Sequence, residues 1–209
     1  MKYKLSNVAS RTRIEELTKL PFKYANIYKP KRKIDGTKEQ NVSIITMENP
    51  DEIIQGIWGM LPQNYEDHWN KFQQIKSTLH TCINDIYNNV LYKEALFKRR
   101  CLLIVTGFYA HKLLGNKVEN YLVEKENREP FYLAGIYNTT EDGFYTCTVI
   151  NTNATEELNS INNLYETMPL QIPQMFKNKW LDKNTTKEEL AHLISKPYHI
   201  NFCVQKIIS

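Results

Sequence analysis

The stretch KRRCLLIVTGFYAH covers residues 98–111 and joins a basic pair to an apolar run. A short, continuous apolar run of this kind is typical of a strand that is buried on both faces. A glycine, two aromatic residues and a histidine follow the run, and such residues at the exit of a buried strand often line a pocket. Ala110 lies between Tyr109 and His111, and a methyl group cannot move protons. The stretch therefore predicts a buried strand that leads into a pocket with one chemically inert position.

The length of 209 residues predicts one domain spanning residues 1–209. Hydrophobic residues make up 42% of the chain and aromatic residues 11%, which is ordinary for a folded protein and excludes a mainly disordered chain. The formal net charge of +4 permits a polyanionic partner without requiring one. A local basic patch is therefore more informative than the total charge.

Several classes of site are disfavoured by residue spacing. The four cysteines form no C-x-x-C pair and no dense disulfide framework, so we expect reduced thiols in a cytosol. The five histidines show no zinc spacing and the seven glycines form no phosphate loop, so we expect no metal and no cofactor. The amino-terminal segment has no signal-peptide core and no run reaches 18 apolar residues, so we expect a cytoplasmic protein without a membrane partner.

The hydrophobic pattern predicts strands with short helices inserted between them. Capping boxes predict helices that start near Thr12, Asn153 and Thr185. The other expected elements are strands at 42–47 and 53–61, a helix within 66–79, extended segments over 101–151 and a last strand at 198–204. Without regular β-α alternation, this order predicts an α+β fold whose curved, mainly antiparallel sheet is barrel-like and flanked by short helices.

Residues 28–40, YKPKRKIDGTKEQ, are expected to form an exposed basic loop. Lys31 and Arg32 lie at its centre, beside Lys29 and Lys33 and close to tyrosines. Basic residues interleaved with aromatic ones suit a groove in which cations contact phosphates and rings stack on bases. A solvated loop without a ligand remains the alternative.

His80 and Cys82 lie two residues apart, so on an extended segment both side chains face the same side. Such a pair could act as a nucleophile with its base, provided that the thiol pKa is lowered. Ordinary packing of the two side chains is the competing interpretation.

In their serial order, several segments resemble the SRAP family of SOS-response-associated peptidases and abasic-site-processing proteins. The segments that carry the resemblance are WGMLP (58–62), KRRCLLIVTGFYAH (98–111), FYLAGIY (131–137), TCTVINTNA (146–154), ETMPLQIP (166–173) and KWLD (179–182). The resemblance covers nearly the full length and implies an SRAP-like α+β fold. It also implies a site that bonds covalently to the aldehyde of an abasic site in single-stranded DNA.

The chain departs from that family at each reacting position. Lys2 replaces the nucleophilic cysteine, His80 an asparagine, Ala110 the catalytic glutamate, and Tyr165 the histidine that acts on the leaving hydroxyl. Two arginines that contact DNA in the family are replaced by Cys82 and Thr167. Since an alanine moves no proton, the resemblance implies a catalytically degenerate member. Lys2 is also too large for normal removal of Met1, which we expect to stay in place.

We therefore expect a monomer that binds single-stranded DNA without reacting with it. The positions expected to contact nucleic acid are Lys4, Lys31, Arg32, Trp58, Cys82, Arg100, Tyr109 and Thr167. For Trp58, Phe108 and Tyr109 a plain core role stays open, and Arg99 and Arg100 could be solvated residues at a helix end. Two other functions stay open as well: an abasic-site crosslinking or lyase enzyme that uses the amine of Lys2, and a protein interaction module without DNA binding.

Overall fold

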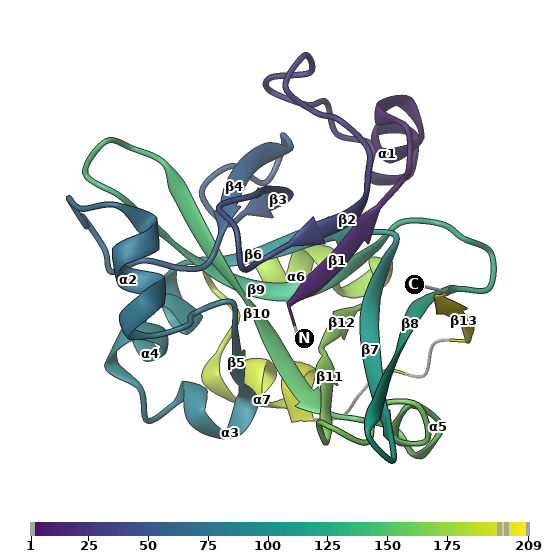
Figure 1. Ribbon diagram of the computed structural model, residues 1–209. Coiled ribbons are helices and arrows are strands. Elements are labelled where there is room, and N and C mark those ends of the chain that lie inside the picture. The colour runs from purple at the N-terminus through teal and green to yellow at the C-terminus, as the bar shows by residue number, and fades with distance from the viewer. Residues whose placement is uncertain (1–2, 196–197, 199–200, 208–209) are drawn as a thin grey trace.

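The computed structural model describes residues 3–195, 198 and 201–207, which form two sheets (Figure 1). In the larger sheet, β10 pairs with both β4 and β9, so a ring of five strands closes. The ring runs through β10 (Tyr145–Asn153), β4 (Ile54–Trp58), β3 (Asn41–Thr46), β6 (Arg100–Val105) and β9 (Phe131–Thr139). Three short strands extend it: β5 (His80–Cys82) and β11 (Thr167–Pro169) pair with β10, and β12 (Gln171–Ile172) pairs with β9.

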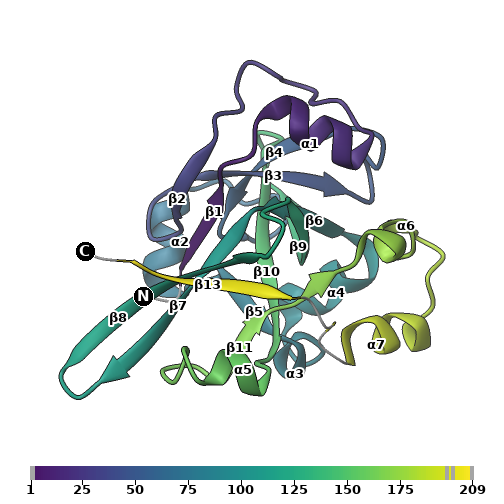
Figure 2. The same cartoon turned by 90° about the vertical axis from the view of Figure 1, so that its right-hand side faces the viewer.

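The smaller sheet has five strands and packs against the ring. Its order is β13 (Phe202–Ile207), β8 (Lys117–Lys125), β7 (Gly107–Leu114), β1 (Lys4–Asn7) and β2 (Lys31–Asp35). All of its pairings are antiparallel, whereas the larger sheet has two parallel pairings, β10 with β4 and with β5. Figure 2 shows the β7–β8 hairpin projecting from the body of the molecule.

Two buried clusters explain why the run CLLIVT is apolar throughout. In β6, Leu103 belongs to the cluster shared by the two sheets, while its neighbours Leu102 and Ile104 belong to the cluster under the helices. Successive side chains of a strand point to opposite faces, so a strand covered on both faces needs apolar residues at every position. The α+β, barrel-like, mainly antiparallel fold expected from the sequence is therefore confirmed.

Short helices pack against both clusters. They are α1 (Arg11–Thr18), α2 (Trp69–Ile75), α3 (Ile83–Ile86), α4 (Val90–Lys98), α5 (Glu156–Asn159), α6 (Lys177–Leu181) and α7 (Lys187–Ser195), with a 3₁₀ turn at Gln174–Phe176. Apolar buried residues of α1, α4, α6 and α7 join the cluster under the helices, whereas those of α2 and α5 join the cluster shared by the two sheets. In the part of the chain described here, no helix has the length and apolar character needed to cross a membrane.

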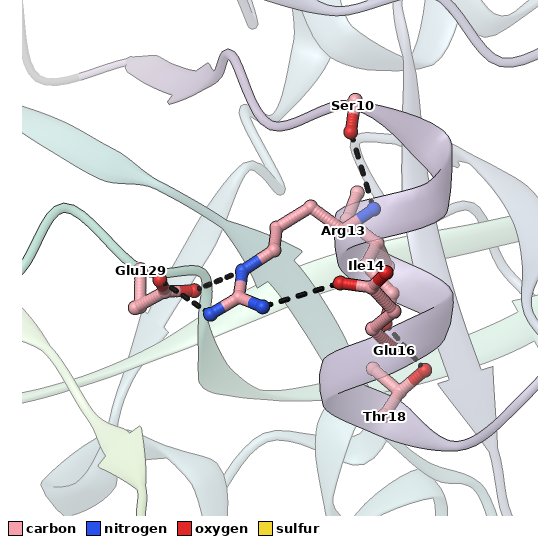
Figure 3. A network of polar contacts seen from close by, with 6 residues as sticks. All are labelled: Ser10, Arg13, Ile14, Glu16, Thr18 and Glu129. Carbon is pink, nitrogen blue, oxygen red and sulfur yellow. Dashed lines mark hydrogen bonds and ion pairs between the residues drawn. The ribbon is translucent and has the colours of Figure 1, made fainter.

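The helix starts lie close to the expected positions, but different residues cap them. Ser10 rather than Thr12 caps α1, because its Oγ accepts a hydrogen bond from the backbone N of Arg13 (Figure 3). The Arg13 guanidinium also donates two hydrogen bonds to Glu129, which fixes the helix to the loop before β9. At α5 the cap is Thr155, and at α7 the capping box is formed by Thr186 and Glu189.

Two further expectations are corrected by the structure. The basic segment 28–40 is not wholly a loop, because Lys31–Asp35 forms β2 and pairs with β1. The extended segments over 101–151 are divided between two sheets rather than one, with β7 and β8 in the smaller sheet. The helix expected within 66–79 is found at Trp69–Ile75, although Ile75 is 84% exposed. Of the last strand expected at 198–204, residues 199 and 200 lie outside the described part, and the strand found is Phe202–Ile207.

Candidate functional site

A small cavity of about 40 Å³ lies where the beginning of β1 meets β7, β10 and β11. β1 is held there by pairing with β7, in which Leu5 faces Phe108, and by the ring of Tyr3, which stacks on His80 at 5.2 Å. The described amino-terminal end therefore lies at the cavity. Lys2 lies outside the described residues.

Six of the residues expected at the site line this cavity. They are Lys4, Trp58, His80, Tyr109, Tyr165 and Thr167, and they come from β1, β4, β5, β7, β11 and the loop between α5 and β11. Segments that are far apart in the sequence and carried the family resemblance thus meet at one place. The remaining lining residues are Leu5, Phe108, His111, Val149, Asn151, Asn162 and Pro169.

The loop before β11 is fixed by two asparagines that the sequence did not single out. The Asn162 side chain accepts a hydrogen bond from the backbone N of His111 and donates to the carbonyls of Tyr165 and Thr167. Asn163 accepts from the backbone N of Leu113 and donates to its carbonyl. Both amides therefore hold the segment that carries Tyr165 and Thr167 against β7. Two successive asparagines in a loop were a weak sequence signal, because Asn is common in loops for local reasons.

Ala110 does not line the cavity, although both of its neighbours do. Its side chain is 2% exposed and belongs to the same buried cluster as Leu5 and Phe108. The position at which the resemblance implies a glutamate is thus occupied by a methyl group packed among apolar side chains. It can supply no proton transfer.

Trp58 and Phe108 are core aromatics that reach the edge of the cavity. Trp58 is 3% exposed, and its indole Nε1 donates a 2.8 Å hydrogen bond to the carbonyl of Leu79. Phe108 packs edge-on against Phe202 with ring centroids 5.8 Å apart. A ring buried in this way offers no open face to a nucleobase, so the structure favours the core role for both residues.

Tyr109 is only partly buried, and its hydroxyl donates a 2.8 Å hydrogen bond to the carbonyl of Arg32. Burial raises the pKa of Tyr109, the charge of Arg32 opposes that shift, and the charge of Glu124 adds to it. Tyr109 therefore ties β7 to β2 across β1 as a neutral phenol at physiological pH.

Lys4 and Asp35 are paired in register on β1 and β2 at the mouth of the cavity. Burial lowers the pKa of the Lys4 ammonium, the charge of Lys33 lowers it further, and the charge of Asp35 works in the opposite direction. Burial opposes ionisation of Asp35, but hydrogen bonds from Thr37 and the charges of Lys4 and Lys33 hold its pKa below the ordinary value. Asp35 is therefore ionised, and Lys4 loses its proton more easily than an exposed lysine does.

Cys82, Lys31 and Arg32 lie outside this cavity. Cys82 is half-buried and lines a neighbouring, more open hollow of about 620 Å³, to which His80 also contributes. Lys31 lines a groove of about 480 Å³ between β2 and β3, and Arg32 donates a hydrogen bond to Gln205 on β13. The basic strand therefore leads away from the cavity and along the outside of the smaller sheet.

Arg100 was expected to contact nucleic acid, and the structure contradicts this. Its side chain is completely buried, and the guanidinium donates to the carbonyls of Leu96 and Phe97 at the end of α4 and to those of Trp180 and Asp182 at the end of α6. The carboxyl-terminal ends of helices carry partial negative charge, which favours a cation there. Burial lowers the pKa of Arg100 to about 10, with the charge of Asp182 opposing the shift, so it stays charged at neutral pH. Arg100 joins two helices and is not accessible to a ligand.

The cavity combines one amine, two imidazole rings, two phenols, an indole, a hydroxyl and two amides, with no carboxylate among its lining side chains. The Oγ1 atom of Thr167 is buried there without a hydrogen-bond partner among the described residues. Buried polar atoms usually have partners, so an unpaired one at a cavity wall suits a small polar ligand or a water molecule. The arrangement can bind a polar group of few atoms and can offer it an amine.

The sequence was compared with protein families and with known proteins. The family model described as SOS response associated peptidase (SRAP) matches residues 3–207. An abasic site processing protein of Saccharomyces cerevisiae is 26% identical over 150 residues. Those residues are 68% of this chain and 39% of the yeast protein, so the match covers much less than half of that relative's length.

Solved structures share the fold at low sequence identity. A protein from Bacteroides thetaiotaomicron has a TM-score of 0.87 at 22% identity, covering 99% of this chain and 92% of its own. A protein from Bordetella bronchiseptica has a TM-score of 0.79 at 14% identity, with coverage of 99% and 100%. A phage-related protein from the same organism has a TM-score of 0.71 at 12% identity, with coverage of 99% and 94%. Because the family model covers nearly the whole sequence, this chain belongs to the SOS response associated peptidase (SRAP) family.

Proposed function

We propose that this protein acts in DNA repair by binding single-stranded DNA around abasic sites, and that it lacks the cysteine-based crosslinking chemistry of its family. The observation that carries the proposal is the cavity at the start of β1. Lys4, His80, Tyr165 and Thr167 meet there, at positions matching the family's reacting and DNA-contacting residues. The substitutions at Ala110 and Tyr165 leave the cavity walls in place while removing the carboxylate and the imidazole that the family chemistry uses.

The basic strand β2 supports a nucleic-acid partner. Lys31, Arg32 and Lys33 are all exposed on this strand, and Lys29 precedes them. Tyr109 joins β2 to the wall of the cavity through its hydrogen bond to Arg32. A single strand whose abasic sugar enters the cavity can therefore extend along these cations, which would neutralise its phosphates.

The test is the salt dependence of binding to a fluorescently labelled single strand, followed by anisotropy. If Lys29, Lys31, Arg32 and Lys33 each neutralise one phosphate, the log-log slope is about −0.7 × 4, or about −3. A variant with Lys31→Gln, Arg32→Gln and Lys33→Gln keeps one of these contacts, so its slope falls to about −0.7.

The matched control replaces three cations remote from β2, with Lys93→Gln, Lys98→Gln and Lys183→Gln, and keeps the wild-type slope. These residues belong to α4 and to the turn after α6, which cover the other core cluster. A wild-type protein that shows no binding at low salt, or a slope unaffected by the β2 changes, contradicts the proposal.

A further inference from the structure

Lys4 contributes the one aliphatic amine among the described residues that line the cavity. Within the described part of the chain, the Lys4 nitrogen forms no hydrogen bond and has no carboxylate oxygen within 4 Å. Asp35 is nevertheless its register partner on β2. The amine is thus held at the cavity by the backbone of β1 and is not locked into a salt bridge.

The size of the cavity selects which part of a damaged strand can enter. One water molecule requires about 10–15 Å³ on the same scale, so 40 Å³ admits about three water-sized groups. A nucleobase is far larger, whereas the aldehyde end of a ring-opened abasic sugar is a group of a few atoms. The cavity is therefore large enough for the aldehyde end of such a sugar and too small for a nucleobase.

The surroundings of Lys4 favour its neutral form more than bulk water does. Burial is the main reason for its lowered pKa, and Lys33 adds to it. Only a neutral amine has the lone pair that attacks a carbonyl carbon, so desolvation and a cationic neighbour are what activate a lysine nucleophile. The charged and titratable side chains around it come from β2, β5, β7 and the α5–β11 loop: Lys33, Asp35, His80, Tyr109, His111 and Tyr165.

We propose that Lys4 is a nucleophile that captures abasic sites in single-stranded DNA as an imine, an activity that rests on the DNA-binding function proposed above. The neutral Lys4 nitrogen bonds to the aldehyde carbon C1′ as the C=O double bond becomes single, and one proton passes from that nitrogen to the oxygen to give a carbinolamine. Loss of the remaining nitrogen-bound proton and departure of the hydroxyl as water leave a C=N bond. No oxidant or reductant takes part, and the proton lost from nitrogen balances the one taken up as water leaves. His80 and Tyr165 line the same cavity and are placed to relay these protons.

The experiment incubates the protein with single-stranded DNA that carries one abasic site and adds borohydride, which reduces an imine to a stable secondary amine. We expect a covalent adduct on denaturing gels, absent with an intact strand, and peptide mapping by mass spectrometry that locates the DNA remnant on Lys4. Lys4→Arg keeps the positive charge and removes the nucleophilic amine, so it loses the adduct. Thermal unfolding of Lys4→Arg checks that the loss is not a failure to fold.

The matched control is Lys98→Arg, at an exposed position of α4 away from the cavity and from β2, which retains the adduct. An adduct that persists in Lys4→Arg, or that maps to Lys2 or to the amino-terminal nitrogen, overturns the assignment. Wild-type protein that binds the abasic strand by anisotropy but gives no adduct overturns this inference and leaves the DNA-binding function standing. Absence of both binding and adduct overturns the two together.

Discussion

Arg100 and Lys4 are cations in two different environments of the same fold. Arg100 lies in the outer core, fully enclosed, and its guanidinium is shared by four backbone carbonyls. Lys4 lies at the cavity between the sheets, where burial lowers its pKa and its strand partner Asp35 only moderates the effect. A buried cation whose hydrogen-bond donors are all paired stabilises the structure. A cation whose charge is only partly balanced by its neighbours has a shifted pKa and can take part in a reaction.

The difference follows from what surrounds each side chain. The carboxyl-terminal ends of α4 and α6 present several unpaired carbonyls at one point, and the planar guanidinium satisfies them together. Lys4 lies on β1, which pairs with β2 on one side and β7 on the other, so the backbone groups of these strands are already engaged within one sheet. The charge of Arg100 thus serves to hold two helix ends together, whereas the charge of Lys4 is available to the cavity.

The largest effect is expected from Arg100→Ala, which removes the guanidinium that is hydrogen-bonded to the helix ends. The carbonyls of Leu96 and Trp180 are left buried and unpaired, at about 1–3 kcal/mol each, so the free energy of unfolding should fall by about 2–6 kcal/mol. Urea unfolding followed by tryptophan fluorescence measures the change. Lys98→Ala, an exposed neighbour on α4, serves as the control and should change stability by less than about 0.5 kcal/mol. A loss below about 1 kcal/mol for Arg100→Ala would refute the structural role.

A smaller effect is expected from Ala110→Glu, which restores the carboxylate that the family resemblance implies. Because Ala110 is packed with Leu5 and Phe108, the new carboxyl is largely buried and should lower stability by about 1–3 kcal/mol at pH 7. Burial raises the folded-state pKa of such a group above its unfolded value, so the penalty shrinks as the pH falls towards 4. Unfolding curves at both pH values test this.

The control for that substitution is Ala191→Glu on an exposed position of α7, where the cost should stay within about 0.5 kcal/mol at either pH. If Ala110→Glu is as harmless as Ala191→Glu, the side chain at position 110 reaches solvent or the cavity. The pocket would then still accommodate the family's acid.

The smallest effect is expected from Asp35→Asn, which sharpens the description of Lys4. The amide oxygen can still accept the hydrogen bonds from Thr37, so the turn after β2 is preserved. The folded-state pKa of Asp35 is lowered, and its contribution is therefore present above the unfolded pKa and is lost as the pH falls through the folded value. Asp35 is largely solvated, so we expect less than about 1 kcal/mol at pH 7 and no difference in strong acid.

The same substitution removes the one charge that raises the pKa of Lys4. Borohydride trapping by Asp35→Asn should therefore reach its maximum at a lower pH than trapping by the wild type. Asp142→Asn, on the turn before β10, is the control and leaves the trapping profile where it was. A profile shifted to higher pH by Asp35→Asn would show that the carboxylate does not act on Lys4 through its charge.

Much of the architecture could be predicted from local pattern. The apolar run before Thr106, the turn at Asn49–Asp51 and the turn at Asp35–Gly36 all lie where periodicity and turn residues indicate. Helix caps were misplaced by one or two residues, because several Ser and Thr residues near each start can accept the same backbone hydrogen bond. The strand Lys31–Asp35 was missed because its charged residues have low strand propensity and only pairing with β1 stabilises it.

The sequence predicted which residues would meet at the candidate site better than it predicted what each residue does there. Spacing and family resemblance brought Lys4, His80, Tyr165 and Thr167 together correctly, although they are up to 163 positions apart in the chain. The same reasoning misassigned Arg100, because a basic pair beside a strand looks the same whether its side chains face water or helix ends. The role of Asn162 could not be predicted, because its side chain forms hydrogen bonds with backbone groups of β7 and of its own loop.

The sequence by itself determined the class of fold, the family and the presence of an alanine at position 110, because apolar periodicity and residue identity are local properties. The tertiary structure decided which cation is enclosed and which borders a cavity, since desolvation depends on every segment that packs around a charge. It also decided that the groups at the cavity are an amine, imidazoles, two phenols and amides, with no carboxylate among the lining side chains. Burial and electrostatic environment are properties of the assembled molecule, and no stretch of the chain encodes them alone.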